Sequence, residues 1–223
     1  MATVMLQIYI WYVVAGEFAA FLLPGHDAWL SQMWLAQLLT YSLTWISLQP
    51  LLRRLPPGSF QMGPANGRSL LWGLFFAIVL GFLVGPAGRG RLLPWDAPLQ
   101  GELRAAKDLV AARSFTGVAA LFLLVGVVAP AFEELLFRGF LLVTLGGTSS
   151  PIFLSSCLFG VFHCHFHSLN FRPLLPTAIL GAWFAYVSLK TRSLTTAILL
   201  HQFWNGGHLL LVAVLTQVGV SSR

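Results

Sequence analysis

Long apolar runs without charged side chains follow one another along this chain. The charge-free windows are residues 28–52, 69–88, 114–132, 139–171, 173–189 and 193–222. A helix that crosses a lipid bilayer needs about 20 consecutive apolar residues, and most of these windows approach or exceed that length. They are continuously apolar, whereas a strand of a membrane barrel alternates over about ten residues. The pattern predicts a bundle of membrane-spanning helices.

Breaks in the apolar pattern divide the chain into about seven helices of spanning length. Pro-Gly, Gly-Gly and Arg-Pro pairs mark several of the breaks, because these residues favour turns. The expected spans are residues 4–23, 29–50, 69–85, 115–144, 151–167, 173–189 and 194–216. Segment 95–113 has apolar residues at helical spacing and charges on its other faces, as in a helix at the membrane surface or an exposed loop helix. We expect an all-α multi-pass fold of about six to eight spans in one membrane domain, residues 1–223.

Composition supports this prediction. The 223 residues are 57% hydrophobic and 9% charged, whereas a soluble domain carries about a quarter charged residues. The net charge of +6 could suggest nucleic acid, but the basic residues lie mostly between apolar windows, where membrane proteins keep them. We expect the lipid bilayer as a partner and no nucleic acid, and the sequence does not indicate an oligomeric state.

Two adjacent carboxylates and an arginine interrupt the fourth span. Ionisable groups at a helix centre cost about 2.5–3.5 kcal/mol on insertion scales unless they face a partner or water. Glu134 and Arg138 are four residues apart, so they share a helical face and can pair. Glu133 lies on another face beside a like charge, which makes it a candidate general base; a purely structural ion network is the alternative. Pro130 is expected to bend the helix and free backbone groups.

A run of histidines lies near the end of the fifth span. In a helix, His163 and His167 share a face and His165 points elsewhere; we favour His163 as the inward group and the other two as rim residues. In a strand, all three would converge as in a metal site, and Cys164 would then suggest zinc. Because the span is so apolar, we favour the helix over the strand.

The last span places His201, Asn205 and His208 on one helical face. A histidine and an amide can donate hydrogen bonds to an oxyanion, or the histidine can ligate a metal while the amide positions water. Hydrogen bonds that only pack helices are the alternative. If the spans alternate in direction, Glu133, His163 and His201 lie about 18, 18 and 10 Å from the same membrane side. Three helices can therefore bring these groups into one cavity.

In order, these motifs resemble the signature of the CPBP family, the intramembrane proteases related to type II CAAX prenyl endopeptidases and bacteriocin-immunity proteins. The family's Glu-Glu-x-x-x-Arg motif matches residues 133–138, and its Phe-x-x-x-His motif matches Phe159 and His163. Its closing His-x-x-x-Asn motif matches His201 and Asn205. The resemblance implies an all-helical bundle around a water-filled catalytic cavity.

The resemblance covers residues 115–210 and implies a role for each matching residue. Glu133 and His163 would activate a water, and His201 and Asn205 would stabilise the oxyanion. The supporting residues would be Glu134, Arg138 and Phe159. Zinc on Glu133, His163 and His201 stays open, because family members are described both as metalloproteases and as glutamate-dependent enzymes; no organic cofactor is expected.

We therefore expect an intramembrane endopeptidase that cleaves a membrane-associated protein or peptide, with a prenylated CAAX-type protein as one candidate substrate. A non-catalytic scaffold or self-immunity protein of the same family is the alternative. A proton-relay transporter is disfavoured, because the polar residues cluster at one depth and mark no path through the membrane. The expected location is a bacterial plasma membrane, with a chloroplast or other organelle membrane as alternatives.

Overall fold

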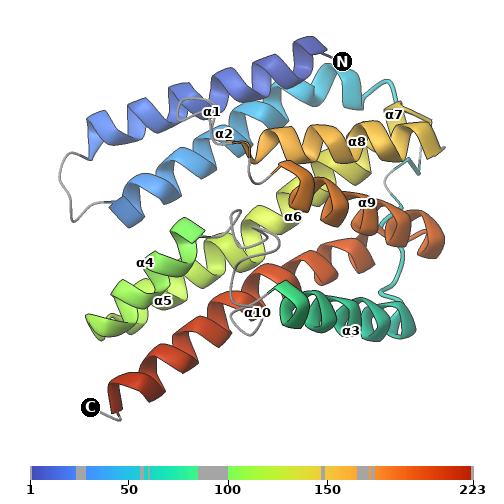
Figure 1. Cartoon of the computed structure of the whole chain (residues 1–223). Coiled ribbons are helices and arrows are strands. Elements are labelled where there is room, and N and C mark those ends of the chain that lie inside the picture. The colour runs from blue at the N-terminus through green and yellow to red at the C-terminus, as the bar shows by residue number, and fades with distance from the viewer. Residues whose placement is uncertain are drawn as a thin grey trace. The chain divides into compact units, whose positions relative to one another are not determined.

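In the structure, a computed structural model, the regular elements of the described part are all helices (Figure 1). The described residues are 2–23, 29–55, 58–59, 61–84, 100–146, 149–164, 171 and 174–221. No strand occurs within these ranges, which confirms the predicted all-α class. The chain divides into two compact units, Met1–Pro56 and Pro57–Arg223.

The first unit is a pair of helices, α1 (Ala2–Leu22) and α2 (Trp29–Leu52), packed against each other. The indole Nε1 of Trp11 donates to Ser47 Oγ at 3.1 Å and joins them. Thr40 is buried, and its hydroxyl donates to the Ala36 carbonyl of its own helix at 2.8 Å. Such a bond satisfies a hydroxyl within an apolar helix.

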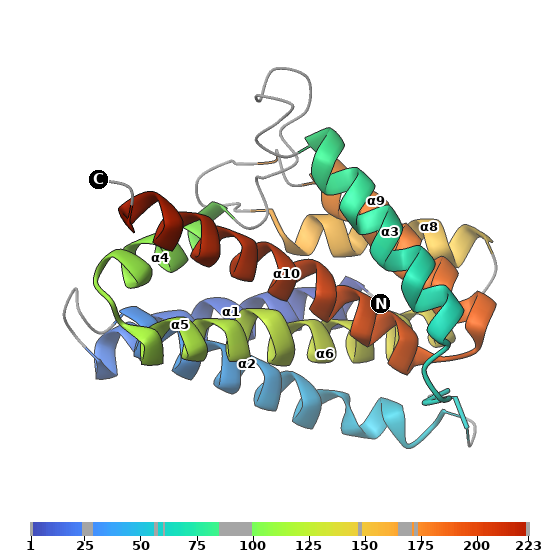
Figure 2. The ribbon, with the colours of Figure 1, turned by 90° about the horizontal axis from the view of Figure 1, so that it is seen from below.

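The second unit is built around a 30-residue helix, Phe115–Thr144. The other helices of this unit are α3 (Gly67–Val84), α4 (Gln100–Ala111), α8 (Ser149–Phe162), α9 (Leu174–Thr191) and α10 (Leu194–Ser221). Helix α10 packs along the long helix, and α8 packs against α9 (Figure 2). Helix α10 also contacts α3, α4 and α9, so it lies at the centre of the unit.

Every expected span contains a helix, but a helix must also be long and apolar enough to cross a membrane. Among the described residues, two helices are long and apolar enough to cross a bilayer, Phe115–Thr144 and Leu174–Thr191. Helix α4 begins at Gln100, in the segment predicted to be a surface or loop helix. It packs against α10 and buries Ala106, so part of its apolar side is covered by protein. The other spans stay a prediction.

The turn between α9 and α10 anchors the start of α10. Ser193 Oγ accepts from the Thr196 N–H at 3.2 Å, a helix N-cap, and donates to the Gly63 carbonyl at 2.9 Å. The Leu194 N–H donates to the Gln61 carbonyl at 2.8 Å. These bonds tie the first turn of α10 to residues 61–63. They therefore fix the position of α10, and with it the positions of His201 and Asn205 along the helix.

Candidate active site

The two adjacent glutamates lie between two stretches of widened helix. The long helix reads α5 (Phe115–Leu121), η4 (Phe122–Val128), α6 (Ala129–Glu134), η5 (Leu135–Leu141) and α7 (Leu142–Thr144). In η4 and η5 an N–H bonds to the carbonyl five residues back, the π pattern. The Ala129 N–H donates to Leu124 O, and the Leu142 N–H to Phe137 O. Single π turns inside α-helices are frequent at functional sites.

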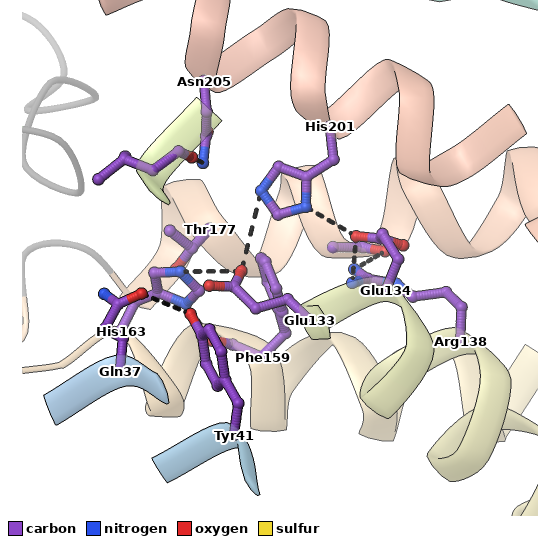
Figure 3. Close-up of polar contacts among 12 residues, drawn as sticks. Gln37, Tyr41, Glu133, Glu134, Arg138, Phe159, His163, Thr177, His201 and Asn205 are labelled. Atoms are coloured by element: carbon purple, nitrogen blue, oxygen red, sulfur yellow. Dashed lines mark hydrogen bonds and ion pairs between the residues drawn. The ribbon is translucent and has the colours of Figure 1, made fainter. Parts of the chain in front are cut away.

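Glu134 joins Arg138 and His201 in a buried network. Its Oε1 accepts from Arg138 Nη1 at 2.7 Å and from His201 Nδ1 at 2.9 Å (Figure 3). The Glu134 and Arg138 side chains are both 0% exposed. The predicted Glu134–Arg138 pair is confirmed. Because the carboxylate is an acceptor, Nδ1 of His201 carries the hydrogen, which leaves the other ring nitrogen to face Glu133.

Arg138 is held on its other sides by a carbonyl and by aromatic rings. Its Nη2 donates to the Gly181 carbonyl at 2.8 Å, and its Cζ lies 4.4 Å from the Phe159 ring centroid. A Cβ at position 181 would meet Arg138 Nη2 at 3.1 Å and Phe159 at 3.0 Å. Sequence reasoning missed Gly181; the available signal was a glycine inside an apolar helix, which often has a packing reason.

Glu133 and two imidazoles form the centre of the site. His163 Nε2 lies 3.6 Å from Glu133 Oε2, and His201 Nε2 lies 3.8 Å from the same oxygen (Figure 3). The three residues come from α6, the end of α8 and α10, so the predicted convergence of three helices is observed. Both distances exceed a direct hydrogen bond.

The orientation of His163 follows from the way α8 ends. The helix stops just before this residue, earlier than the predicted span, because the His163 N–H turns to the Gly160 carbonyl at 3.2 Å. The Phe159 carbonyl is thereby left for the side chain, and His163 Nδ1 donates to it at 2.8 Å. That bond assigns the hydrogen to Nδ1 and turns Nε2 towards Glu133. The two remaining histidines of the run, His165 and His167, lie outside the described residues.

Aromatic rings fix the planes of both imidazoles. Phe184 stacks on His201 with centroids 4.7 Å apart and an interplanar angle of 24°. Phe159 is 2% exposed, and its ring lies 4.5 Å from that of His163. Phe159 thus contacts both Arg138 and His163, and its supporting role stays a prediction. Rings held by packing keep their nitrogens aimed before substrate arrives.

Asn205 lies one turn beyond His201 and faces the long helix. Its Nδ2 donates to the Val125 carbonyl at 3.2 Å, and the residue is 8% exposed. An amide has two N–H donors, so one of them is committed to this carbonyl. His208, predicted on the same face, donates from Nδ1 to the Trp204 carbonyl of its own helix at 2.6 Å.

The donor set was also tested for a metal. Two histidines and a carboxylate are the smallest set that holds catalytic zinc with an open position. In the described part of the chain, however, no three or more histidine, cysteine, aspartate or glutamate side chains are arranged to hold a metal ion. Glu133, His163 and His201 converge without meeting this geometry. Zinc at these residues stays a prediction.

A cavity of about 280 Å³ lies beside Arg138. Its lining residues are Ser59, Gln61, Arg138, Gly139, Leu142, Val143, Gly146, Ser188, Leu189 and Leu194. Glu133, His163 and His201 do not line it, so this cavity is separate from the predicted catalytic one. Among the described residues, Arg138 belongs both to this lining and to the buried network of Glu134 and His201.

The site holds a carboxylate facing two oriented imidazoles, a buried arginine and an amide one turn away. Hydrolysis needs a base for water and donors for the developing negative charge. The helical bundle and this group of side chains are therefore compatible with acid–base hydrolysis.

The comparison with protein families adds to this observation. Residues 115–207 match the family described as type II CAAX prenyl endopeptidase Rce1-like. This match confirms the resemblance stated from the motifs, and the matched segment holds Glu133, His163, His201 and Asn205. A search of curated proteins found no match. A search of solved structures found none either.

Proposed function

We propose that the protein is an intramembrane endopeptidase in which Glu133 activates the attacking water. The observation that carries the proposal is the convergence of His163 and His201 Nε2 on one Glu133 oxygen, at 3.6 and 3.8 Å. The match of this segment to an endopeptidase family supports it. Proton transfer by a positioned group contributes about 10²- to 10⁴-fold to a rate.

In the proposed reaction, Glu133 takes a proton from water while the water oxygen bonds to the carbonyl carbon of the scissile peptide. His163 orients this water through Nε2, because its Nδ1 hydrogen is committed to the Phe159 carbonyl. The carbonyl π electrons move to the oxygen as the tetrahedral intermediate forms. When the carbon–nitrogen bond breaks, the leaving amine takes the proton from Glu133. The base is thus restored for the next turnover.

The oxyanion would be met by donors from α10. Asn205 offers the amide N–H that does not bond to Val125 O. His201 already donates from Nδ1 to Glu134, so a donor role at Nε2 requires the doubly protonated ring. Removing one oxyanion donor from an enzyme typically costs about 10²- to 10³-fold in kcat. Both residues are buried and already oriented, as such a role demands.

The expected membrane location is part of the same proposal. Large apolar side chains are exposed on helices of both units, among them Phe21, Trp72, Phe115, Phe153 and Leu175. We expect the protein to stay in the membrane pellet after alkaline carbonate extraction and to leave it only with detergent. Accessibility labelling of single cysteines in each loop would count the spans. Release by carbonate would contradict the proposal of about seven spans.

The proposed substrate class is a prenylated CAAX-type peptide presented at the membrane. We expect detergent-purified protein to cleave a farnesylated CAAX-type fluorogenic peptide faster than the same peptide without the lipid. The physical reason is that each buried CH₂ of a lipid contributes about 0.8 kcal/mol to membrane partitioning. The measurement is the initial rate for each peptide, with a transmembrane peptide as a third probe.

The outcomes separate the candidate functions. Preference for the transmembrane peptide would keep the endopeptidase and reject the prenyl substrate. Cleavage of none of the three peptides would support the scaffold or self-immunity alternative. Metal analysis of the same preparation addresses zinc: stoichiometric zinc, with activity lost on chelation and regained on zinc addition, would establish a metalloprotease.

A further inference from the structure

Pro130 removes a backbone donor where the long helix widens. In the π pattern, the donor to a carbonyl is the N–H five residues on. For Val125 that residue is Pro130, which has no N–H. The N–H four residues on belongs to Ala129 and donates to Leu124 O instead. The Val125 carbonyl therefore has no donor within its own helix.

Asn205 supplies the missing donor from the neighbouring helix. Val125 is 5% exposed, and a buried carbonyl needs a hydrogen-bond partner. Asn205 Nδ2 provides one at 3.2 Å. Close packing of the two helices allows this reach, since a Cβ on Gly126 would meet Gly206 Cα at 3.1 Å. Pro130 thus leaves the Val125 carbonyl without a donor from its own helix. Gly126 and Gly206 let the two helices approach closely enough for the Asn205 amide to reach that carbonyl.

We propose that Pro130 is a positioning residue for Asn205. Because Pro130 leaves the Val125 carbonyl without an intrahelical donor, this carbonyl accepts one N–H of the Asn205 amide. The bond fixes the side-chain rotamer of Asn205 and directs its second amide N–H to the reacting carbonyl of the substrate. The catalytic part of this inference rests on the proposed function. The structural part, a coupling between Pro130 and Asn205, does not depend on activity.

A double-mutant cycle in thermal stability tests the coupling. Asn205→Ala should lower Tm by about 4 °C, the shift expected from one lost buried hydrogen bond in a protein of this size. In the Pro130→Ala background the new N–H at position 130 can bond to Val125 O, so the same Asn205 change should lower Tm by less than about 1 °C. Equal shifts in both backgrounds would overturn the proposal.

Gln202→Ala is the matched control. Gln202 also donates to a carbonyl of η4, that of Val127, at 3.0 Å. The residues four and five places on from Val127 are Ala131 and Phe132, and both have an N–H. Its Tm effect should therefore add to that of Pro130→Ala. Coupling as strong for Gln202 as for Asn205 would mean a general change in helix packing and would overturn the proposal.

Kinetics test the catalytic part. With the farnesylated CAAX-type peptide, Pro130→Ala should lower kcat roughly tenfold or more at unchanged KM, because a misplaced donor acts on the transition state. An unchanged kcat, or a rise in KM alone, would reject the positioning role. If the wild type cleaves no peptide, the proposed function fails while the Tm cycle still decides the coupling.

Two further variants serve as a second test of the Pro130 effect and as a control. Pro130→Gly restores the same N–H and should show the same loss of coupling as Pro130→Ala. Since both variants gain a backbone donor, failure of both to fold would count against the proposal. Pro50→Ala, at an exposed proline in α2, should leave both the Asn205 shift and kcat unchanged.

Discussion

Glu133→Gln is expected to lower kcat by about 10²- to 10⁴-fold, the contribution of a general base. Glutamine keeps the size of the side chain and can still hydrogen-bond, but it cannot take a proton from water. The Glu134–Arg138–His201 network does not use Glu133, so folding should be preserved. The measurement is kcat on the farnesylated peptide, beside Tm and the elution volume in detergent.

Controls separate chemistry from folding in this variant. Glu17→Gln, at an exposed glutamate of α1, should leave both kcat and Tm at the wild-type values. If Glu133→Gln retains wild-type cleavage, Glu133 is not the base. If the Glu133→Gln protein loses stability together with activity, Glu133, His163 and His201 form a structural network. That is the result that the scaffold alternative predicts.

Glu134→Ala is expected to destabilise the fold by about 3–5 kcal/mol, the cost of leaving a buried charge without its partner. The change would strand the Arg138 guanidinium, whose Nη1 bonds to Glu134 at 2.7 Å. It would also remove the acceptor of His201 Nδ1 at 2.9 Å. The measurement is the free energy of unfolding in detergent, or the yield of monodisperse protein if the variant does not survive purification.

The double variant Glu134→Ala/Arg138→Leu provides the test of cause. Removing both partners avoids the stranded charge, and apolar replacement of a buried pair is often neutral. Most of the lost stability should therefore return, while cleavage stays impaired because His201 has lost its anchor. A Glu134→Ala protein as stable as the wild type would show that no buried ion pair exists.

The positions of the helices could be predicted from the sequence, because long apolar windows with few charged residues are typical of membrane-spanning helices. Continuous apolar windows bounded by Gly and Pro predicted helices at 29–50, 115–144 and 173–189, and each contains one. The predicted end of the fifth span was wrong. There the His163 N–H turns back to Gly160, a local choice of hydrogen-bond partner that hydropathy does not record.

The site was predictable where spacing along one helix decides a contact. Glu134 and Arg138, four residues apart, pair as expected. Contacts between helices were harder, because they depend on close approach: Gly181 for Arg138, and Phe184 for the ring of His201. The link between Asn205 and the long helix was not predicted either, since it arises from a π register that sequence periodicity does not reveal.

The two π segments have a consequence for changes in chain length. Each π turn holds more residues than an α turn, so deleting one residue from η4 or η5 would allow a return to α geometry. Such a deletion would keep the residues on either side on their present faces. A deletion from α6 has no extra residue to remove, so it would turn one side of the helix by about 100° relative to the other and would separate the face of Phe122 and Gly126, which meets α10, from the parts that follow. The long helix should therefore tolerate the loss of one residue from η4 or η5 better than the loss of one from α6.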